Sequence, residues 1–234
     1  MPSILKAENL VSYIGLYTIL QGVSVDVAEG DIVTILGRNG AGKTTFLKTI
    51  MGMVDVRSGK LELGGTSIVG KPPYEIARMG VGYVPEDYGI FDQLTVQENL
   101  RLPMWKADAE SWGRVDYVLD LFPDLKIAYK RPARSLSGGQ RQMLAVGRAM
   151  VNDNKIILID EPSKGLAPII IEKMGLAFIE IAKTRTILLV EQNFALACAV
   201  AKRYYIVNEG HTVQGGLVKD LLQDTEAQKR YLGI

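Results

Sequence analysis

The sequence contains very little cysteine and histidine. Among its 234 residues, Cys198 is the single cysteine and His211 the single histidine. One cysteine cannot form an intramolecular disulfide, and these two residues together cannot supply the ligands of a structural zinc site. A disulfide-stabilised fold and a metal centre built from His and Cys are therefore excluded, and the low cysteine content fits a reducing compartment.

The sequence also lacks an excess of either charge. Lys and Arg number 27 and Asp and Glu 26, which gives a formal net charge of +1. Because positive and negative charges nearly cancel, the protein has no overall electrostatic field that would attract nucleic acid or an anionic membrane. We expect no nucleic-acid partner, and any anion site must be built locally.

Long hydrophobic runs are missing as well. A membrane-spanning helix needs about 20 apolar residues in succession, and Lys or Glu interrupts even the apolar region 169–207. Residues 1–8 show neither the basic segment nor the apolar core of a signal peptide. We expect a cytoplasmic protein that reaches a membrane only through partners.

What is present is an ordinary globular composition, with 47% hydrophobic and 23% charged residues. The N-terminal third carries short runs with β-branched residues, punctuated by glycine, which predict strands. These runs lie at about 4–10, 23–27, 32–36, 60–63 and 81–84.

The middle of the chain has a helical pattern. Thr95 and Glu98 have the spacing of a helix-capping box, and apolar residues recur at helical spacing over 111–122, before Pro123. Beyond the middle, Ile156–Ile159 and Thr186–Val190 are continuous apolar runs, which are typical of parallel strands buried on both faces. The alternation predicts an α/β core with a helical insertion.

The strongest motif follows the run at 32–36. It matches G-x-x-x-x-G-K-[ST], the pattern of a phosphate-binding loop between a strand and a helix. Its glycines let backbone N–H groups converge on phosphate oxygens, Lys43 reaches the β and γ phosphates, and the Thr44 hydroxyl can hold Mg²⁺. The motif is Gly37, Arg38, Asn39, Gly40, Ala41, Gly42, Lys43 and Thr44.

Two carboxylates follow the apolar run Ile156–Ile159. Phosphoryl transfer needs an acidic partner for Mg²⁺ and a group that orients the attacking water. Asp160 at the end of the predicted strand suits the first role, and Glu161 suits the second.

A third motif, Leu136-Ser137-Gly138-Gly139-Gln140, opens a helical run that ends near Met150. The ordered set of phosphate loop, L-S-G-G-Q and apolar strand with Asp-Glu resembles the ATP-binding cassette (ABC) ATPases over nearly the whole chain. A Ser hydroxyl and glycine N–H groups at a helix N-terminus form an anion site. The resemblance implies that this signature segment contacts ATP held by the phosphate loop of a second cassette.

The resemblance implies an α/β fold: a P-loop NTPase of the ABC cassette type with a mixed core sheet, an antiparallel β subdomain and a helical signature subdomain. Residues 1–234 would form a single ABC ATPase domain. The core and β subdomain would occupy about 1–90 and 152–234, and the helical subdomain about 91–151.

The resemblance also implies the cofactors ATP and Mg²⁺ and assigns the site. Glu161 and Gln192 would be catalytic, and Thr44, Asp160 and Glu86 would hold the metal. Nucleotide contacts would come from Gly37, Arg38, Asn39, Gly40, Ala41, Gly42, Lys43, Thr44, Thr45, Ser137, Gly138, Gly139, Gln140 and, at the adenine, Ile14.

Several of these positions depart from the usual family pattern. Glu86 stands where a glutamine normally contacts Mg²⁺, and Gln192 stands at the position of the switch histidine. Glutamine can hydrogen-bond a phosphate oxygen but carries no proton at neutral pH, so hydrolysis is expected to be slow. Ala167 replaces an aspartate of the loop between cassettes, and Ile14 replaces an aromatic residue that stacks on adenine.

The segments around Glu86, Glu161, Gln192 and Tyr231 together resemble the second ATPase subunit of branched-chain amino acid importers. This branch implies two integral-membrane permease subunits, a second related ABC ATPase subunit or a second copy of this chain, and, indirectly, an extracytoplasmic substrate-binding protein. The chain would lie on the inner face of the cell membrane. The alternatives are an importer of urea or short amides, a soluble non-transport ABC protein, and a weakly hydrolysing nucleotide-binding regulator.

Overall fold

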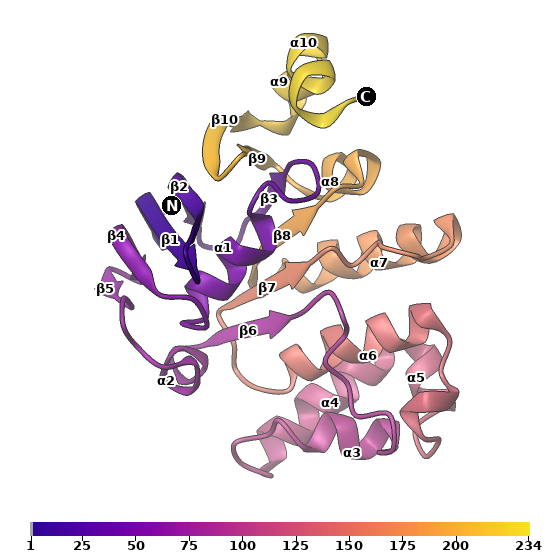
Figure 1. Cartoon of the computed structure of the whole chain (residues 1–234). Helices are drawn as coiled ribbons and strands as arrows, with labels where there is room; N and C mark the ends of the chain where they lie inside the picture. The colour runs from indigo at the N-terminus through magenta and orange to yellow at the C-terminus, as the bar shows by residue number, and fades with distance from the viewer. Residues whose placement is uncertain (1) are drawn as a thin grey trace.

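The computed structural model, which describes residues 2–234, contains two β-sheets, and the smaller one lies at one side of the molecule (Figure 1). The larger sheet has six strands in the order β10-β9-β3-β8-β7-β6, and the smaller has four in the order β2-β1-β4-β5. This pairing of a mixed sheet with an antiparallel sheet confirms the expected fold class.

Five strands of the larger sheet run parallel. They are β3 (Ile32–Leu36), β6 (Val81–Val84), β7 (Ile156–Asp160), β8 (Thr186–Glu191) and β9 (Arg203–Asn208), and β10 (His211–Leu217) pairs antiparallel at the edge. Every residue of β3, β7 and β8 is buried. Their continuous apolar sequences arise because both faces of the sheet are covered.

The strands of the smaller sheet are longer than the sequence pattern predicts. Its strands are β1 (Ser3–Ile14), β2 (Tyr17–Ala28), β4 (Val56–Leu63) and β5 (Thr66–Ser67). The pairing of β1 with β2 shifts register several times, and Asn9 has a φ of 49°, so apolar and polar residues stop alternating part-way along β1. Residues 56–59, the first half of β4, were not predicted as strand because none of them is buried and 57–59 are exposed.

The two faces of the six-stranded sheet bury separate cores. On one face, α1 (Lys43–Ile50) and the smaller sheet pack together, and Phe46 and Leu47 of α1 are fully buried. Successive residues of β7 point to opposite sides, so Leu158 joins this core and Ile159 the other. The helix α2 (Pro73–Arg78) follows β5 on the same side.

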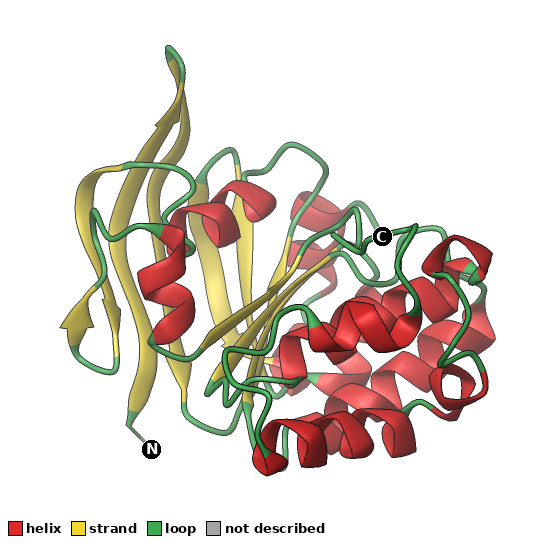
Figure 2. Cartoon of the chain, turned by 90° about the horizontal axis from the view of Figure 1, so that it is seen from below, coloured by secondary structure: helices red, strands yellow, loops and turns green. Residues whose placement is uncertain are grey.

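The opposite face is covered by helices, which Figure 2 shows grouped on one side of the sheet. They are α3 (Val96–Arg101), α4 (Ala109–Leu121), α5 (Pro123–Ile127), the 3₁₀ turn η1 (Ala133–Ser135), α6 (Gly138–Met150), α7 (Pro168–Ile181) and α8 (Phe194–Val200). The capping box of Thr95 and Glu98 is present. Pro123 does more than stop a helix: α4 ends at Leu121, and Pro123 opens α5 at a first-turn position that proline tolerates.

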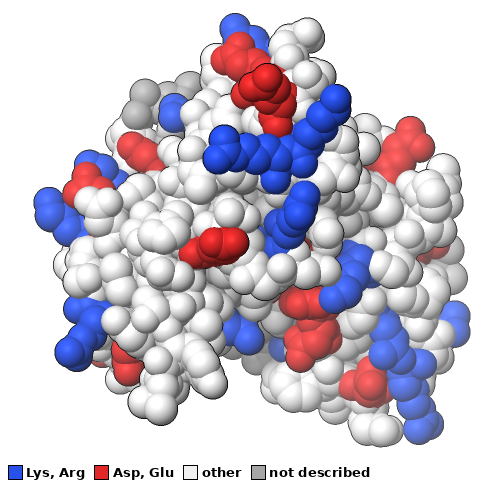
Figure 3. Space-filling model, turned by 45° about the horizontal axis from the view of Figure 1, so that its top comes forward, with Lys and Arg blue, Asp and Glu red and all other residues white. Residues whose placement is uncertain are grey.

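The chain ends in short helical segments, α9 (Val218–Leu221), α10 (Thr225–Ala227) and the π-helical η2 (Gln228–Leu232). No helix within residues 2–234 is both long and apolar enough to cross a membrane. Acidic and basic side chains are interspersed on the face shown in Figure 3, and large areas of it carry neither.

Strand register brings the motifs to one edge of the sheet. Leu36 pairs with Glu191 across β3 and β8, and Asp160 pairs with Val190 across β7 and β8. Because parallel strands end at the same edge, the phosphate loop, the carboxylates after β7 and the segment after β8 are neighbours in space.

Candidate functional site

The phosphate loop leaves β3 at Gly37 and enters α1 at Lys43. A Cβ atom on Gly37 would lie 2.2 Å from the carbonyl oxygen of Val207, so only glycine fits against β9 here. Gly42, the residue before α1, has a left-handed backbone with a φ of 105°. These two glycines allow the tight turn that aims the start of α1 at the loop.

Lys43 is buried inside this turn, with 3% of its side chain exposed. Its Nζ donates to the carbonyl oxygens of Gly37 at 2.9 Å and Arg38 at 3.2 Å. It also lies 3.1 Å from Oε1 of Glu161. The loop thus holds its lysine between backbone oxygens and a carboxylate, all acceptors that phosphate oxygens can replace.

The next residue, Thr44, joins the loop to β7. Its hydroxyl donates to Oδ1 of Asp160 at 3.0 Å. Asp160 is fully buried, its Oδ2 has no hydrogen-bond partner among residues 2–234, and burial raises its pKa to about 6. An unpartnered carboxylate oxygen beside a hydroxyl is the oxygen-rich donor set that Mg²⁺ prefers, so these residues fit the ion.

Glu161 occupies a strained turn directly after β7, with a φ of 45°. Its N–H donates to the carbonyl oxygen of Val190 at 2.9 Å. This turn points the carboxylate at Lys43 and sets it beside the phosphate loop.

A cavity of about 310 Å³ lies over the loop. The Glu86 carboxylate reaches it from the segment after β6 and is ion-paired with Lys164. The lining residues are Ile19, Asn39, Gly40, Ala41, Gly42, Lys43, Thr44, Thr45, Glu86, Glu161 and Lys164. The loop with its metal-ligand candidate Thr44, the second candidate Glu86 and the catalytic carboxylate candidate Glu161 therefore share one space.

The signature segment lies elsewhere. Ser137 caps α6: its hydroxyl accepts from the N–H of Gln140 at 3.3 Å, and its own N–H donates to the Gln140 side chain at 3.0 Å. Gly139 packs closely on α7, since a Cβ there would lie 2.7 Å from Ile170. Ser137 and Gly138 are exposed, and neither they nor Gln140 line the cavity over the phosphate loop.

Gln192 lies at the mouth of a second cavity, of about 290 Å³, which it shares with Glu161 and Lys164. The residue before it, Glu191, is buried and accepts hydrogen bonds from Ser163 and from the backbone of Gln192. His211 begins the edge strand β10 and lies outside both cavities, as its sequence position indicates.

These features match a family model described as "ABC transporter" over residues 20–164, more than half of the chain. The matched span includes the phosphate loop, the signature segment and the carboxylates after β7. The chain belongs to the ABC transporter family. It is an ATP-hydrolysing transport ATPase that binds nucleotide, and ATPases of this kind work with membrane permeases.

Curated members of the family resemble the chain along its whole length. A "high-affinity branched-chain amino acid transport ATP-binding protein", BraG of Pseudomonas aeruginosa, is 39% identical over 98% of this chain and 99% of its own. LivF of Archaeoglobus fulgidus, a "probable branched-chain amino acid transport ATP-binding protein", is 37% identical over 92% and 93%. LptB of Escherichia coli, a lipopolysaccharide export ATP-binding protein, is 33% identical over 98% and 97%.

Solved ABC cassettes share the fold. The cassette MJ1267 has a TM-score of 0.87 at 27% identity, covering 100% of both chains. The same cassette in its ADP conformation has a TM-score of 0.85 at 27% identity, covering 97% of both chains.

Ile14 ends β1 near the tip of the first hairpin, and Ile19 of β2 lines the cavity over the loop. The contact of Ile14 with adenine stays a prediction. Ile19 belongs to no motif, and only the fold brings it to the loop, whereas Lys164 lies three residues after Glu161 in the same segment. Glu191 was overlooked because an acid at a strand end carries no signal of burial.

Proposed function

We propose that this chain is an ATP-hydrolysing subunit of an ABC importer for branched-chain amino acids. It would pair with a second, related cassette and dock on two permease subunits at the inner face of the membrane, served by an external binding protein. The observation that carries the ATPase assignment is the meeting of Lys43, Thr44 and Glu161 in one cavity. The similarity to BraG and LivF, over nearly the full length of each chain, supports the cargo.

In this proposal the phosphates of ATP take the place of the acceptors that now surround Lys43. The loop N–H groups and the start of α1 bind phosphate oxygens, and Lys43 turns from Glu161 to the β and γ phosphates. Mg²⁺ would be held by Thr44 and Asp160, with Glu86 as a further oxygen ligand, and when bound it neutralises phosphate charge.

Glu161 then acts as the general base. Water attacks the γ-phosphorus, the bond to the β–γ bridging oxygen breaks, and the proton of the water passes to Glu161. Gln192 donates a hydrogen bond to a γ-phosphate oxygen, which positions the group without exchanging a proton. The exposed Ser137 and the start of α6 bind the ATP of the partner cassette.

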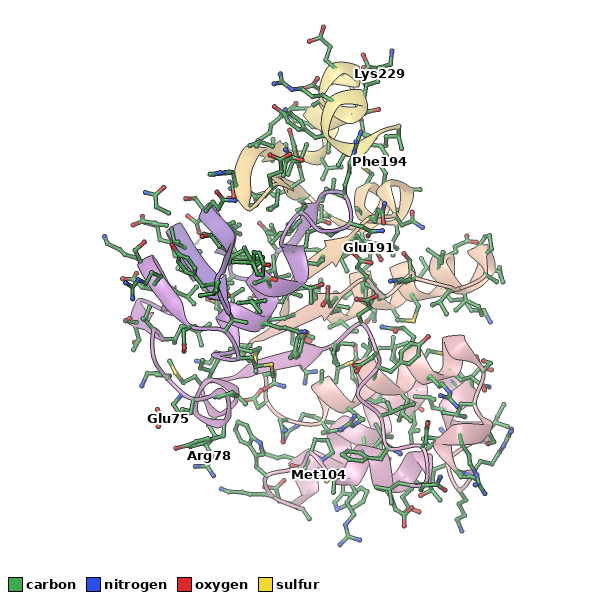
Figure 4. The ribbon with its side chains drawn as sticks, in the orientation of Figure 1. Glu75, Arg78, Met104, Glu191, Phe194 and Lys229 are labelled. Carbon is green, nitrogen blue, oxygen red and sulfur yellow. The ribbon has the colours of Figure 1, made fainter. Side chains whose placement is uncertain are left out.

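A cavity of about 970 Å³ suits a permease segment. It lies between α2 and β6 on one side and the segment after α3 and α6 on the other, and it includes Pro85, Tyr88 and Trp105. Arg78 of α2 and Met104 lie to either side of this region in Figure 4. Because Thr44 and Asp160 line the same cavity, a segment docked there lies directly beside the nucleotide.

The ATPase assignment is tested with purified protein, alone and mixed with its partner cassette. We expect Mg²⁺-dependent ATP hydrolysis that Glu161→Gln lowers by at least about 100-fold, because the amide cannot accept the proton. Equal rates in the wild type and in Glu161→Gln would contradict a role as transport motor.

The cargo and partners are tested in the native host. Tagged protein purified gently from membranes with Mg²⁺-ATP should bring two multi-span permeases and a second cassette. Deleting the gene should abolish uptake of labelled leucine, isoleucine and valine and leave urea uptake unchanged. Loss of urea uptake alone would assign the amide branch, and recovery of soluble or ribosomal partners alone would refute transport.

A further inference from the structure

We propose that Glu191 is a positioning residue for ATP hydrolysis, whose carboxylate ties the loop after Glu161 to the Gln192 segment so that both groups face the γ-phosphate together. Glu191 ends β8, at the centre of the molecule (Figure 4). This inference rests on the proposed function, because it assigns a residue that sets the geometry of the same reaction.

Four donors converge on this one side chain. Oε1 accepts from the N–H of Ser163 at 3.0 Å, and Oε2 accepts from the Ser163 hydroxyl at 2.9 Å. Oε2 also accepts from the N–H groups of Gln192 at 3.0 Å and Asn193 at 2.9 Å. The carboxylate thus joins two segments that are far apart in sequence. One follows β7 and the other follows β8, which are adjacent strands of the sheet.

The carboxylate is almost completely closed to solvent. Glu191 is 1% exposed, and burial raises its pKa against the opposing effect of these hydrogen bonds. With both oxygens engaged by donors inside the protein, it cannot act as the base. Its contribution to the reaction must pass through the groups that it holds.

Those groups are the ones nearest the chemistry. Ser163 follows Glu161 by two residues, and Gln192 follows Glu191 directly. Both Glu161 and Gln192 line the second cavity, together with Ser163, Glu191 and Asn193. Asn193 also caps α8 by accepting from the N–H of Leu196 at 3.0 Å, so the carboxylate anchors the start of that helix as well.

The decisive change is Glu191→Gln, which keeps the size of the side chain. One of its two terminal atoms becomes an NH₂ donor facing N–H or O–H donors, so at least one backbone N–H of the two segments loses its acceptor. We expect kcat for ATP to fall at least about tenfold while KM for MgATP stays within about twofold, since the phosphate loop is untouched. Amide exchange at Ser163, Gln192 and Asn193, measured by NMR, should speed up at least about tenfold.

Two milder variants, both at Ser163, keep the test valid if the Glu191→Gln protein does not fold. Ser163→Ala removes one of the four hydrogen bonds and should lower kcat about threefold, and Ser163→Thr, which keeps the hydroxyl, should restore it.

The matched control is Asp108→Asn, the same acid-to-amide change at the N-cap of α4, where the side chain accepts only from the N–H of Ser111. Asparagine caps helices as well as aspartate does, so kcat should not change. Rates are corrected for the active fraction by titration with fluorescent ADP.

Three results would overturn the inference. One is a Glu191→Gln protein that binds ADP with full stoichiometry and keeps the wild-type kcat. The second is a fall in kcat that the active-site titration accounts for entirely, and the third is a Ser163→Thr variant as slow as Ser163→Ala. Failure of the proposed function has a different signature, because the wild type itself would then show no hydrolysis above Glu161→Gln.

Discussion

Burial of the ionised Asp160 carboxylate lowers the stability of the folded protein. Its carboxyl is fully buried at the end of β7, with one oxygen bonded to Thr44 and the other without a partner. An ionised group in this position lacks the hydration it has in the unfolded chain. The folded protein without nucleotide or metal therefore carries a cost that a cation relieves.

This cost predicts that Asp160→Asn stabilises the metal-free protein. Burial raises the pKa of Asp160 to about 6 from an ordinary 3.8, so the charged native form is disfavoured. The full cost is present above pH 6 and disappears as the pH falls toward 4, where the native carboxyl has taken up its proton. The variant should gain on the order of 2 kcal/mol at pH 7.5, or about 4–8 °C in Tm.

Thermal unfolding in EDTA, recorded from pH 4 to 8, tests this expectation. The gain in Tm should shrink with falling pH, and the variant should also lose the stabilisation that MgATP gives to the wild type. A Tm difference that is independent of pH, or a variant less stable than the wild type at pH 7.5, would show that the Asp160 charge carries no such cost.

At the scale of elements, the position of the signature helix α6 depends on one glycine. A Cβ on Gly139 would lie 2.7 Å from the Ile170 side chain of α7, whereas a Cβ on Gly138 would meet nothing closer than 3.6 Å. The first contact is too short for any real pair of carbons and the second is ordinary. Two adjacent glycines of one motif therefore have different structural demands.

We expect Gly139→Ala to lower the free energy of unfolding by about 1–3 kcal/mol, because α6 and α7 must move apart. Gly138→Ala should be neutral or slightly stabilising, since alanine favours a helix over glycine. Urea unfolding followed by circular dichroism measures both. Equal stabilities for the two variants would contradict the close packing of α6 on α7.

The elements also show what a single sequence can predict. Strands β3, β7 and β8 were predictable because they are buried on both faces, and the spacing of the capping box at Thr95 predicts the start of α3. The long hairpin of β1 and β2 was found only in part. Its register shifts and the positive φ of Asn9 break the alternation on which strand prediction depends.

Site residues divide in the same way. Some site residues form local motifs whose chemistry can be inferred from the sequence alone, namely the phosphate loop, Asp160 and Glu161. The fold places them in contact. Ile19 reaches the site from outside these motifs, whereas Lys164 and Glu191 lie beside Glu161 and Gln192 in the sequence. The partners of Lys164 and Glu191, which are Glu86 and Ser163, depend on strand order and register, which no local pattern of residues encodes.

At the scale of the whole molecule, the two halves of the proposed ATP site lie apart on one chain. The start of α6 exposes Ser137 and Gly138, and neither lines the cavity over the phosphate loop. Under the proposed function, one chain would present both halves of the site to a partner. ATP, through its γ-phosphate, would then bridge two chains, and ADP would not.

This arrangement predicts that Glu161→Gln, which binds ATP without consuming it, doubles its mass from 25.7 kDa when MgATP is added. Analytical ultracentrifugation measures the change, and the same protein with MgADP is the control and should remain monomeric. If mass stays constant with MgATP, both alone and after addition of the second cassette recovered from membranes, the shared site is refuted.

The ion pair between Lys43 and Glu161 gives the reaction an order of events. Without nucleotide, the Glu161 carboxylate lies 3.1 Å from the ammonium group of Lys43 and neutralises it. Under the proposed function, a γ-phosphate would compete for the same ammonium group, and its arrival would release the carboxylate. ATP would therefore have to bind before the general base that hydrolyses it becomes available to the attacking water.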